Sequence, residues 1–141
     1  MSPEPRFVFD TSTIISALLF DDSTPGEAFH AALGTGRILL SDETFGELSQ
    51  VVRREKFDRY TSRPKREQFL VRLLREATLV DVIDEIRESR DPDDDKFLEL
   101  AVSGSASCII SSDQDLLVLK SIRGIPILTP SEFLAWLEGR S

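Results

Sequence analysis

The sequence predicts a doubly wound α/β fold with three α/β/α layers and a mostly parallel five-stranded sheet. Two observations carry this prediction. Five short apolar runs alternate with segments of helical apolar spacing, which is typical of βα units with helices on both sheet faces. The 141 residues suffice for one sizeable core but not for two. We therefore expect a single domain over residues 1–141, with strand order 3-2-1-4-5.

The first half of the chain supplies two strands and three helices. An apolar run before Asp10 predicts the first strand, and another before Ser41 predicts the second. The capping box formed by Thr24 and Glu27 predicts a helix start, and Ser41 is a typical N-cap. The expected elements are a strand at 6–9, a helix across 14–19, a helix from 24 to 34, a strand at 38–40 and a helix after 41.

The second half continues the alternation. Apolar side chains from Phe69 to Ala77 recur at helical spacing, and Thr129 with Glu132 forms a second capping box. Pro126 lies in the last apolar run, and we expect that strand to be outermost because proline is tolerated mainly at a sheet edge. The expected elements are strands at 79–82, 108–110 and 125–128, and helices through 69–77, 97–102, 115–120 and after 129.

Charge is segregated along the chain. The formal net charge of −8 argues by itself against nucleic acid as a partner. Residues 53–75, however, contain nine basic and three acidic residues, a net charge of +6 that leaves −14 for the remainder. This segment is a candidate surface for a polyanion, although a solvated helix face would have the same composition.

Several kinds of chemistry and location are excluded by what the sequence lacks. Cys108 is the single cysteine and lies in an apolar run, so we expect it to be buried. His30 is the single histidine, which excludes catalysis by a histidine pair and suggests a structural role. No apolar run approaches the roughly 18 residues of a membrane span, and MSPEPRFVFD does not resemble a secretory signal. We expect a cytoplasmic protein without membrane association, whose chemistry rests on carboxylates.

Carboxylates gather where this fold would bind a ligand. Asp10 and Asp113 follow the first and fourth predicted strands, whose carboxyl ends would meet at the switch point of the sheet. The acidic run 91–95 begins the helix that leads into the fourth strand, and Glu47 lies one turn into the third helix. Four carboxylates from four separate segments are therefore expected to converge.

Four acids within residues 91–95 are more than helix capping requires. One charge near a helix N-terminus stabilises by about 0.3–1 kcal/mol. Two carboxylates about 4 Å apart repel by about 4 kcal/mol at an effective dielectric of ~20. A hard divalent cation, Mg²⁺ or Mn²⁺, removes this repulsion and suits phosphoryl chemistry. The alternatives are that Asp10 is only an N-cap and that Glu47 is solvated surface.

The acidic motifs resemble those of the PIN-domain family. The matching residues are Asp10-Thr11-Ser12, Glu47, the run 90–101 and the run 112–117. They are most similar to the branch that provides toxins of bacterial toxin–antitoxin systems, related to the VapC ribonucleases, over nearly the whole chain. The resemblance implies an α/β/α fold, four acids that hold Mg²⁺ or Mn²⁺, and endoribonuclease activity by metal-activated water. It also implies a cognate antitoxin and a homodimer as partners.

When the family's motifs are matched to this sequence residue by residue, the resemblance implies a specific set of metal-site residues. The metal ligands are Asp10, Glu47, Asp94 and Asp113, with Asp95 as a substitute for Asp94. Asp91 and Asp115 are expected in the outer shell and Asp93 as a helix cap, while the hydroxyls of Ser12 and Ser112 either orient carboxylates or cap helices. The side chains expected to contact RNA phosphates are Arg53, Arg54, Arg63, Lys65 and Arg66.

Three other interpretations fit less well. A response-regulator receiver domain needs an aspartate after the third strand and a lysine after the fifth, where Ile83 and Thr129 stand. A haloacid-dehalogenase-like phosphatase needs an aspartate where Ser12 stands. The remaining alternative is a catalytically inactive PIN-like module that binds RNA or protein, but such a module would gain nothing from clustered, mutually repelling acids.

Overall fold

The computed structural model describes residues 4–140, so residues 1–3 and 141 of the predicted domain lie outside the described residues. The strands are β1 (Arg6–Phe9), β2 (Arg37–Leu40), β3 (Thr78–Leu79), β4 (Cys108–Ile110), β5 (Ser121–Ile122) and β6 (Ile125–Leu128). The helices are α1 (Thr11–Leu19), α2 (Thr24–Thr35), α3 (Asp42–Val52), α4 (Arg63–Glu76), α5 (Asp95–Ser103), α6 (Gln114–Leu117) and α7 (Pro130–Glu138). Short 3₁₀ helices lie at Glu55–Phe57 and Pro92–Asp94.

The sheet has the order β3-β2-β1-β4-β6-β5 and is parallel except for β5, which runs antiparallel to β6. The α/β/α prediction and the order of its five expected strands are confirmed, with β6 in the place of the fifth. β5 is an additional strand at the edge of the sheet, so the prediction that the strand of Pro126 is outermost is wrong. Proline is tolerated in β6 because the amide that pairs there belongs to the next residue: Ile127 N donates to Lys120 O at 2.9 Å.

The third strand is shorter than predicted. It covers Thr78–Leu79, and one further bond follows, from Val80 N to Leu40 O at 2.8 Å. Beyond this point the amides of Ile83 and Asp84 donate to the Ser103 hydroxyl at 3.1 and 3.2 Å. The chain therefore leaves the sheet edge to cross over α5, because its backbone groups find partners there.

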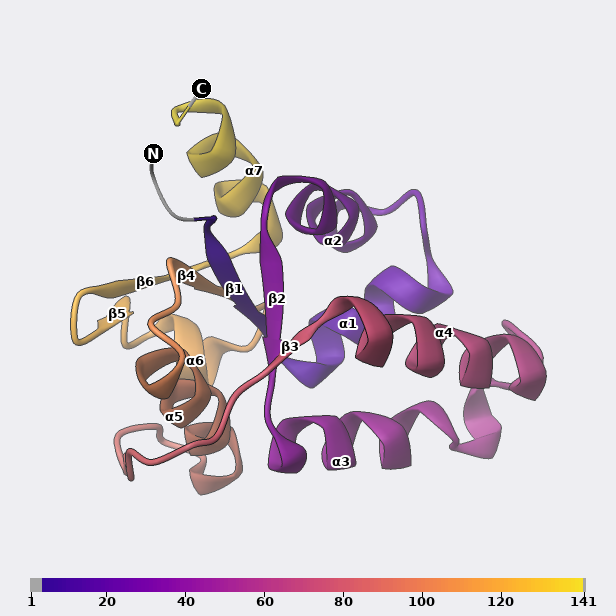
Figure 1. Cartoon of the computed structure of the whole chain (residues 1–141). Coiled ribbons are helices and arrows are strands. Elements are labelled where there is room, and N and C mark those ends of the chain that lie inside the picture. The colour runs from indigo at the N-terminus through magenta and orange to yellow at the C-terminus, as the bar shows by residue number, and fades with distance from the viewer. Residues whose placement is uncertain (1–3, 141) are drawn as a thin grey trace.

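Alternate residues of the central strands face opposite layers of helices. Phe7 and Phe9 pack into a core formed with α1, α2, α3, α4 and α7. Val8, between them, packs into a second core with α5 and α6. Figure 1 shows α5 and α6 on one side of β1 and β2, and α1, α2 and α4 on the other. Both faces of the parallel strands are thus buried, as near-continuous apolar runs require.

Most helix starts follow the predicted capping chemistry. Ser41 caps α3 in a reciprocal box with Thr44, and Thr129 caps α7 in a box with Glu132. The box predicted at Thr24 is wrong by one residue, because Ser23 is the N-cap of α2 and its hydroxyl accepts from Gly26 N at 3.2 Å. Within residues 4–140, no helix combines the length and apolar character that crossing a bilayer requires.

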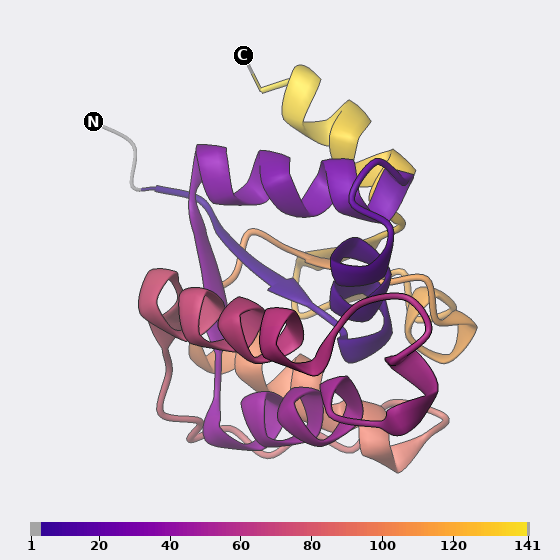
Figure 2. The ribbon, with the colours of Figure 1, turned by 90° about the vertical axis from the view of Figure 1, so that its right-hand side faces the viewer.

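Arg66 does not lie on the predicted RNA-binding surface. Its side chain is 1% exposed, and it forms an ion pair with Asp58 in the segment between α3 and α4, which lie side by side in Figure 2. Two of its nitrogens, Nε and Nη1, have no hydrogen-bond partner in the described part of the chain. Because the guanidinium is enclosed by protein, Arg66 supports the fold, and we exclude it from the phosphate-contacting set.

Replacing Arg66 by alanine should lower the free energy of unfolding by about 2–4 kcal/mol, because a buried stem is removed together with the ion pair. Arg66→Met keeps most of the volume and removes nitrogens without partners, so its stability should equal or exceed that of the wild type. Arg53→Ala breaks only an exposed pair with Glu67 and should change stability by less than about 1 kcal/mol. Urea unfolding checks the three variants, and equal losses for both alanine variants would contradict this role for Arg66.

Candidate metal centre

Asp10 is fixed at the carboxyl end of β1, next to the end of β4. Phe9 pairs with Ile110, and Asp10 N donates to Ile110 O at 3.2 Å. One carboxylate oxygen accepts from Thr13 N at 3.0 Å and caps α1, and the other accepts from the Ser111 hydroxyl. Asp10 is therefore an N-cap as well as a site residue. Burial raises the pKa of its carboxyl, although the hydrogen bonds from Ser111 and Thr13 act in the opposite direction.

Ser111, and not Ser112, supplies the orienting hydroxyl next to Asp113. Ser111 is fully buried, donates to Asp10 and accepts from Asp113 N at 2.9 Å, so it connects two acids. The prediction for Ser112 is wrong, because that residue is exposed to solvent two positions beyond the end of β4 at Ile110. Ser12 does lie near Asp10, with a long contact of 3.4 Å to the carboxylate.

Asp94 is surrounded by other carboxylates of the site, namely those of Asp113, Asp91 and Asp10. It ends the 3₁₀ helix before α5. Desolvation raises the pKa of Asp94 to about 7, and the proximity of the Asp113 carboxyl and the charges of Asp91 and Asp10 add to this shift. Its buried Oδ2 has no hydrogen-bond partner within residues 4–140. The carboxyl group therefore either holds a proton near neutral pH or requires a cation.

The other aspartates near Asp94 do not all have the roles that were predicted for them. Asp91 is the residue that caps, since its carboxylate accepts from Asp93 N at 3.0 Å, so the capping role predicted for Asp93 is wrong. The oxygens of Asp91, Asp94 and Asp115 lie within 4.8 Å of one another. Asp95 points away from this group and binds the preceding loop, where it accepts from the amides of Glu88 and Ser89 at 3.2 and 2.8 Å.

Glu47 is held by two donors, neither of which the sequence interpretation identified. The Thr11 hydroxyl donates to one oxygen, and Lys96 Nζ lies 2.7 Å from the other. Lys96 is 9% exposed and also donates to the backbone carbonyl of Asp93. It is the only basic residue between Arg90 and Lys120, directly after the acidic run, and this isolation was the available signal.

These side chains line one open cleft of about 480 Å³. The acids that line it are Asp10, Glu47, Asp94 and Asp113. The rest of the lining consists of five apolar residues, three hydroxyl residues and two cations: Ile15, Leu19, Val51, Phe57 and Phe97; Thr11, Ser12 and Ser16; Arg54 and Lys56. Asp95 lines a different pocket with Glu43 and Glu99. The four predicted ligands thus share a cleft, and the predicted substitute does not.

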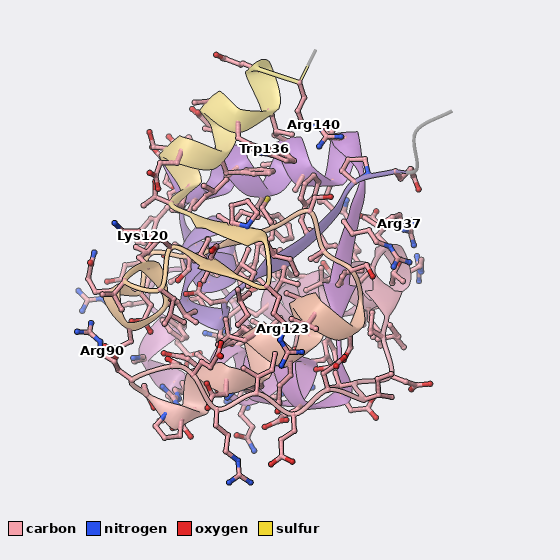
Figure 3. The ribbon with its side chains drawn as sticks, turned by 90° about the vertical axis from the view of Figure 1, so that its left-hand side faces the viewer. Arg37, Arg90, Lys120, Arg123, Trp136 and Arg140 are labelled. Atoms are coloured by element: carbon pink, nitrogen blue, oxygen red, sulfur yellow. The ribbon has the colours of Figure 1, made fainter. Side chains whose placement is uncertain are left out.

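The donor set suits a hard divalent cation. All candidate ligands are carboxylate oxygens, which Mg²⁺ and Mn²⁺ prefer, and Asp94 offers a buried oxygen without a partner. Arg90 supplies partial neutralisation at the rim, with its guanidinium 3.0 Å from Asp115. Figure 3 shows Arg90 well apart from Arg37 and Arg140, so those two arginines do not serve this cluster.

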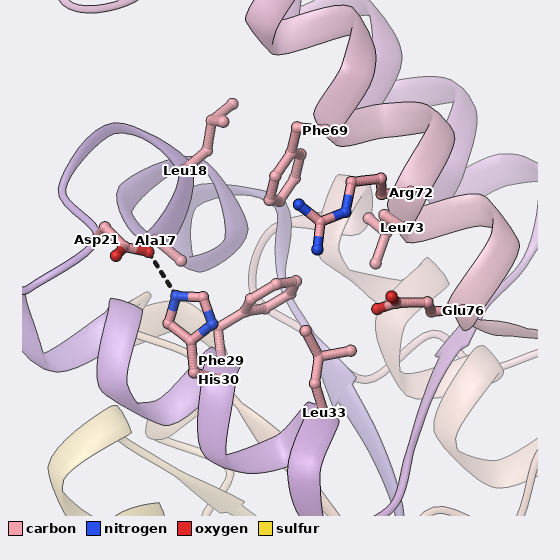
Figure 4. Close-up of a pocket in the computed structure, with 10 residues that line it drawn as sticks. All are labelled: Ala17, Leu18, Asp21, Phe29, His30, Leu33, Phe69, Arg72, Leu73 and Glu76. Carbon is pink, nitrogen blue, oxygen red and sulfur yellow. Dashed lines mark hydrogen bonds and ion pairs between the residues drawn. The ribbon is translucent and has the colours of Figure 1, made fainter.

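A second cavity, of about 200 Å³, lies between α1, α2 and α4 (Figure 4). Its walls are mainly apolar, and its two carboxylates, Asp21 and Glu76, lie on opposite sides. His30 is exposed there and pairs with Asp21, so its predicted structural role amounts to a surface contact. Burial raises the pKa of Cys108 to about 12, as expected for a core thiol. Neither place offers the converging oxygens of the acidic cleft.

Comparison with known families explains this arrangement. The model of the PIN domain family matches residues 6–115, a range that contains every predicted acidic ligand. This chain belongs to the PIN domain family. No curated protein matches the sequence.

Solved structures agree with this fold at low sequence identity. A chain in the crystal structure of VapBC2 from Rickettsia felis bound to a DNA fragment from their promoter superposes with a TM-score of 0.59 and 10% identity, and the match covers 88% of this chain and 98% of that one. PAE2754 from Pyrobaculum aerophilum gives a TM-score of 0.60 and 12% identity, covering 96% and 98%. At these identities the likeness concerns the fold of the PIN domain.

Asp94→Asn should raise the melting temperature of the metal-free protein at pH 8, by roughly 2–4 °C for a gain of about 1 kcal/mol. The folded protein binds the Asp94 proton more tightly than the unfolded chain, since its pKa rises from 3.8 to about 7. The stabilising contribution is complete below about pH 4 and is lost as the pH rises through about 7. At pH 4 the two proteins should therefore melt at nearly the same temperature.

Mg²⁺ or Mn²⁺ should raise the melting temperature of the wild type more than that of Asp94→Asn, because the variant loses one ligand. Asp93→Asn is the matched control, since this exposed neighbour does not line the cleft and should leave both measurements unchanged. Differential scanning calorimetry with and without metal checks this. The same metal-induced increase in all three proteins would rule out Asp94 as a ligand.

Proposed function

We propose that this PIN domain is a metal-dependent endoribonuclease that hydrolyses RNA phosphodiester bonds. The observation that carries the proposal is the unsatisfied Asp94 carboxyl, which lies in one cleft with Asp10, Glu47 and Asp113. Membership in the PIN family supports it, since PIN domains are generally nucleases that use divalent metals. The proposed ligands of Mg²⁺ or Mn²⁺ are these four acids, with Asp91 and Asp115 in the outer shell.

The residues of the cleft have separate tasks in this proposal. When bound, a divalent ion supplies Lewis-acid stabilisation of the phosphoryl charge and a nucleophilic hydroxide at neutral pH. Asp10 and Asp113 are oriented for ligation by the shared Ser111 hydroxyl. Lys96 and Thr11 orient Glu47 and limit its repulsion of the other acids before the metal enters. As a metal ligand, Asp94 would have to be deprotonated, which would make metal affinity depend on pH.

Basic side chains near the cleft would position the RNA. Arg54 and Lys56 line the cleft itself, and Arg63 and Lys65 are exposed on the first turn of α4. Arg53 is exposed but paired with Glu67 at 2.6 Å, so its contribution would require exchange of that partner. Phosphate neutralisation by such groups gives affinity without sequence preference.

We further propose that the protein acts in the cytoplasm as the toxin of a toxin–antitoxin pair, binds a cognate antitoxin and forms a homodimer. The likeness to a chain of the VapBC2 complex supports this, although it concerns only the fold. The cavity of Figure 4 offers apolar walls with charges at its rim, which would suit a partner segment. Alternative positions for the antitoxin in this proposal are the basic surface of residues 53–75 and the acidic cleft.

One observation favours a second function, that of an inactive PIN-like module which binds RNA or protein. Lys96 already provides Glu47 with a cation, and the contact is only 2.7 Å. In an inactive module this pair would be a permanent structural contact. The unsatisfied Asp94 oxygen is not explained by that function, and we therefore prefer the nuclease.

The purified protein should cleave single-stranded RNA in Mg²⁺ or Mn²⁺, and a chelator should abolish cleavage. Asp94→Asn and Asp113→Asn should each lower the rate by about 10²–10³-fold, the loss typical of removing one electrostatic stabiliser of a transition state. Asp95→Asn should retain cleavage if it folds, because Asp95 binds the 88–89 loop instead of lining the cleft. Gel analysis of a labelled RNA checks this, and chelator-resistant cleavage would indicate a contaminating nuclease.

Removing basic side chains should weaken RNA binding and flatten its salt dependence. Arg63→Ala and Lys65→Ala should each reduce the slope of log K against log salt by about 0.7–0.9, the value for one lost phosphate contact. Lys120→Ala, which removes an exposed cation from the turn before β5, is the matched control and should leave the slope unchanged. Fluorescence anisotropy in chelator measures the slopes, and equal slopes for all variants would remove this surface from the proposal.

A further inference from the structure

Two half-exposed aromatic rings belong to residues close in sequence to the lining of the acidic cleft. Leu19 lines the cleft at the end of α1 and is followed by Phe20, which is 48% exposed. Phe57 lines it from the segment after α3, and Tyr60, whose N donates to Phe57 O at 3.0 Å, is 52% exposed. The two rings meet edge to face with centroids 5.6 Å apart. Figure 2 shows the segment between α3 and α4 passing beside α1.

Cations without acidic partners lie beside the Tyr60 ring and in the neighbouring cleft lining. Arg59 lies over the Tyr60 ring at 5.5 Å, and Lys56, which lines the cleft with Arg54, lies over the Phe57 ring at 5.1 Å. Among the described residues, Arg54, Lys56 and Arg59 form no ion pair, whereas Arg53 and Arg66 of the same basic segment are paired with Glu67 and Asp58. These three cations therefore have no carboxylate to displace before they contact a phosphate.

We infer that Tyr60, oriented by Phe20, is a stacking platform for an unpaired nucleobase, and that Arg54, Lys56 and Arg59 contact the flanking phosphates. This inference rests on the proposed function and names its substrate class, a strand with an unpaired base near the bond to be cleaved. Aromatic side chains stack on bases of any sequence, and cations beside them follow the backbone. A base inside a duplex presents no free face to such a ring.

The charges of the cleft favour nucleic acid over a protein segment as the occupant. The carboxylates of the cleft repel a polyanion unless metal is bound, so cations such as Arg54 and Lys56 in its lining are needed to hold the strand. A nucleotide supplies both the negative charge and the flat ring that this surface could accept. The edge-to-face contact also fixes the Tyr60 ring before binding, which reduces the conformational entropy lost on association.

A thermodynamic cycle with wild-type protein in chelator tests the platform without requiring cleavage. The probe is a short single-stranded RNA that carries 2-aminopurine, whose emission falls when it stacks, at one position at a time. Tyr60→Ala should weaken binding about 5- to 100-fold, the range for base–aromatic stacking, and should abolish quenching at one position. Tyr60→Phe and Tyr60→Trp should retain both signals.

An abasic site at that same position should weaken binding to the wild type to the same degree and should add nothing to the loss in Tyr60→Ala. Ile83→Ala, which removes an exposed apolar side chain on the segment over α5, is the control and should behave as the wild type. Fully paired RNA should bind equally to wild type and Tyr60→Ala. Additive losses in the cycle, or unchanged affinity and quenching in Tyr60→Ala, would overturn the platform and favour a protein partner for these rings.

Cleavage in Mg²⁺ separates the two proposals. If the cycle shows coupling but no RNA is cleaved, the platform stands and the nuclease function fails. If RNA is cleaved equally by wild type and Tyr60→Ala while the cycle shows no coupling, the nuclease stands and the platform fails. Circular dichroism melting of Tyr60→Ala and Tyr60→Leu, at a residue more than half exposed, ensures that lost binding is not lost folding.

Discussion

The parallel pairing of β1 with β4 is the constraint on which the site depends. Parallel neighbours end at the same edge of the sheet, so Asp10 and Asp113 are brought together with Ser111 between them. To enter β4 in the same direction as β1, the chain must cross back to the opposite edge of the sheet, and α5 makes this crossing. The start of α5, with its aspartate run, therefore lies at the carboxyl edge beside Asp10 and Asp113. This topology buries Asp94 among other carboxylates, and that burial and the neighbouring charges raise its pKa.

The fold tolerates this concentration of charge by giving most of its carboxylates a partner. Asp10 caps a helix, Asp95 binds loop amides, Glu47 is held by Lys96 and Asp115 by Arg90. Asp94 is left with a buried oxygen that no group of residues 4–140 satisfies. An inactive domain would be expected to lose such a group, because it destabilises the folded state above neutral pH. A cation site is the simplest explanation for this unsatisfied Asp94 oxygen.

The cations of the basic segment 53–75 have two different roles, which the composition of the segment does not distinguish. Arg66 is enclosed and pairs with Asp58, so one of its charges supports the packing of α4 against the segment that follows α3. Arg59 remains available beside the exposed Tyr60 ring, and Arg54 and Lys56 remain available in the cleft lining. The paired and the unpaired cations lie within a few residues of one another in the sequence. Whether a cation is paired depends on whether the folded structure brings an acidic residue into contact with it.

The sequence by itself determined the fold class, the order of the central strands and the edge at which the acids gather, because apolar periodicity and strand-end positions are local properties. It also favoured Asp94 over Asp95 through spacing, and the cleft agrees in placing Asp94 within it. The tertiary structure alone decided that Ser111 replaces Ser112, that Asp91 replaces Asp93 as cap, and that Lys96 reaches Glu47. Each of these depends on the direction of a side chain toward a residue distant in sequence or across a turn. Periodicity and spacing do not specify such directions, since they arise only when the helices and strands pack.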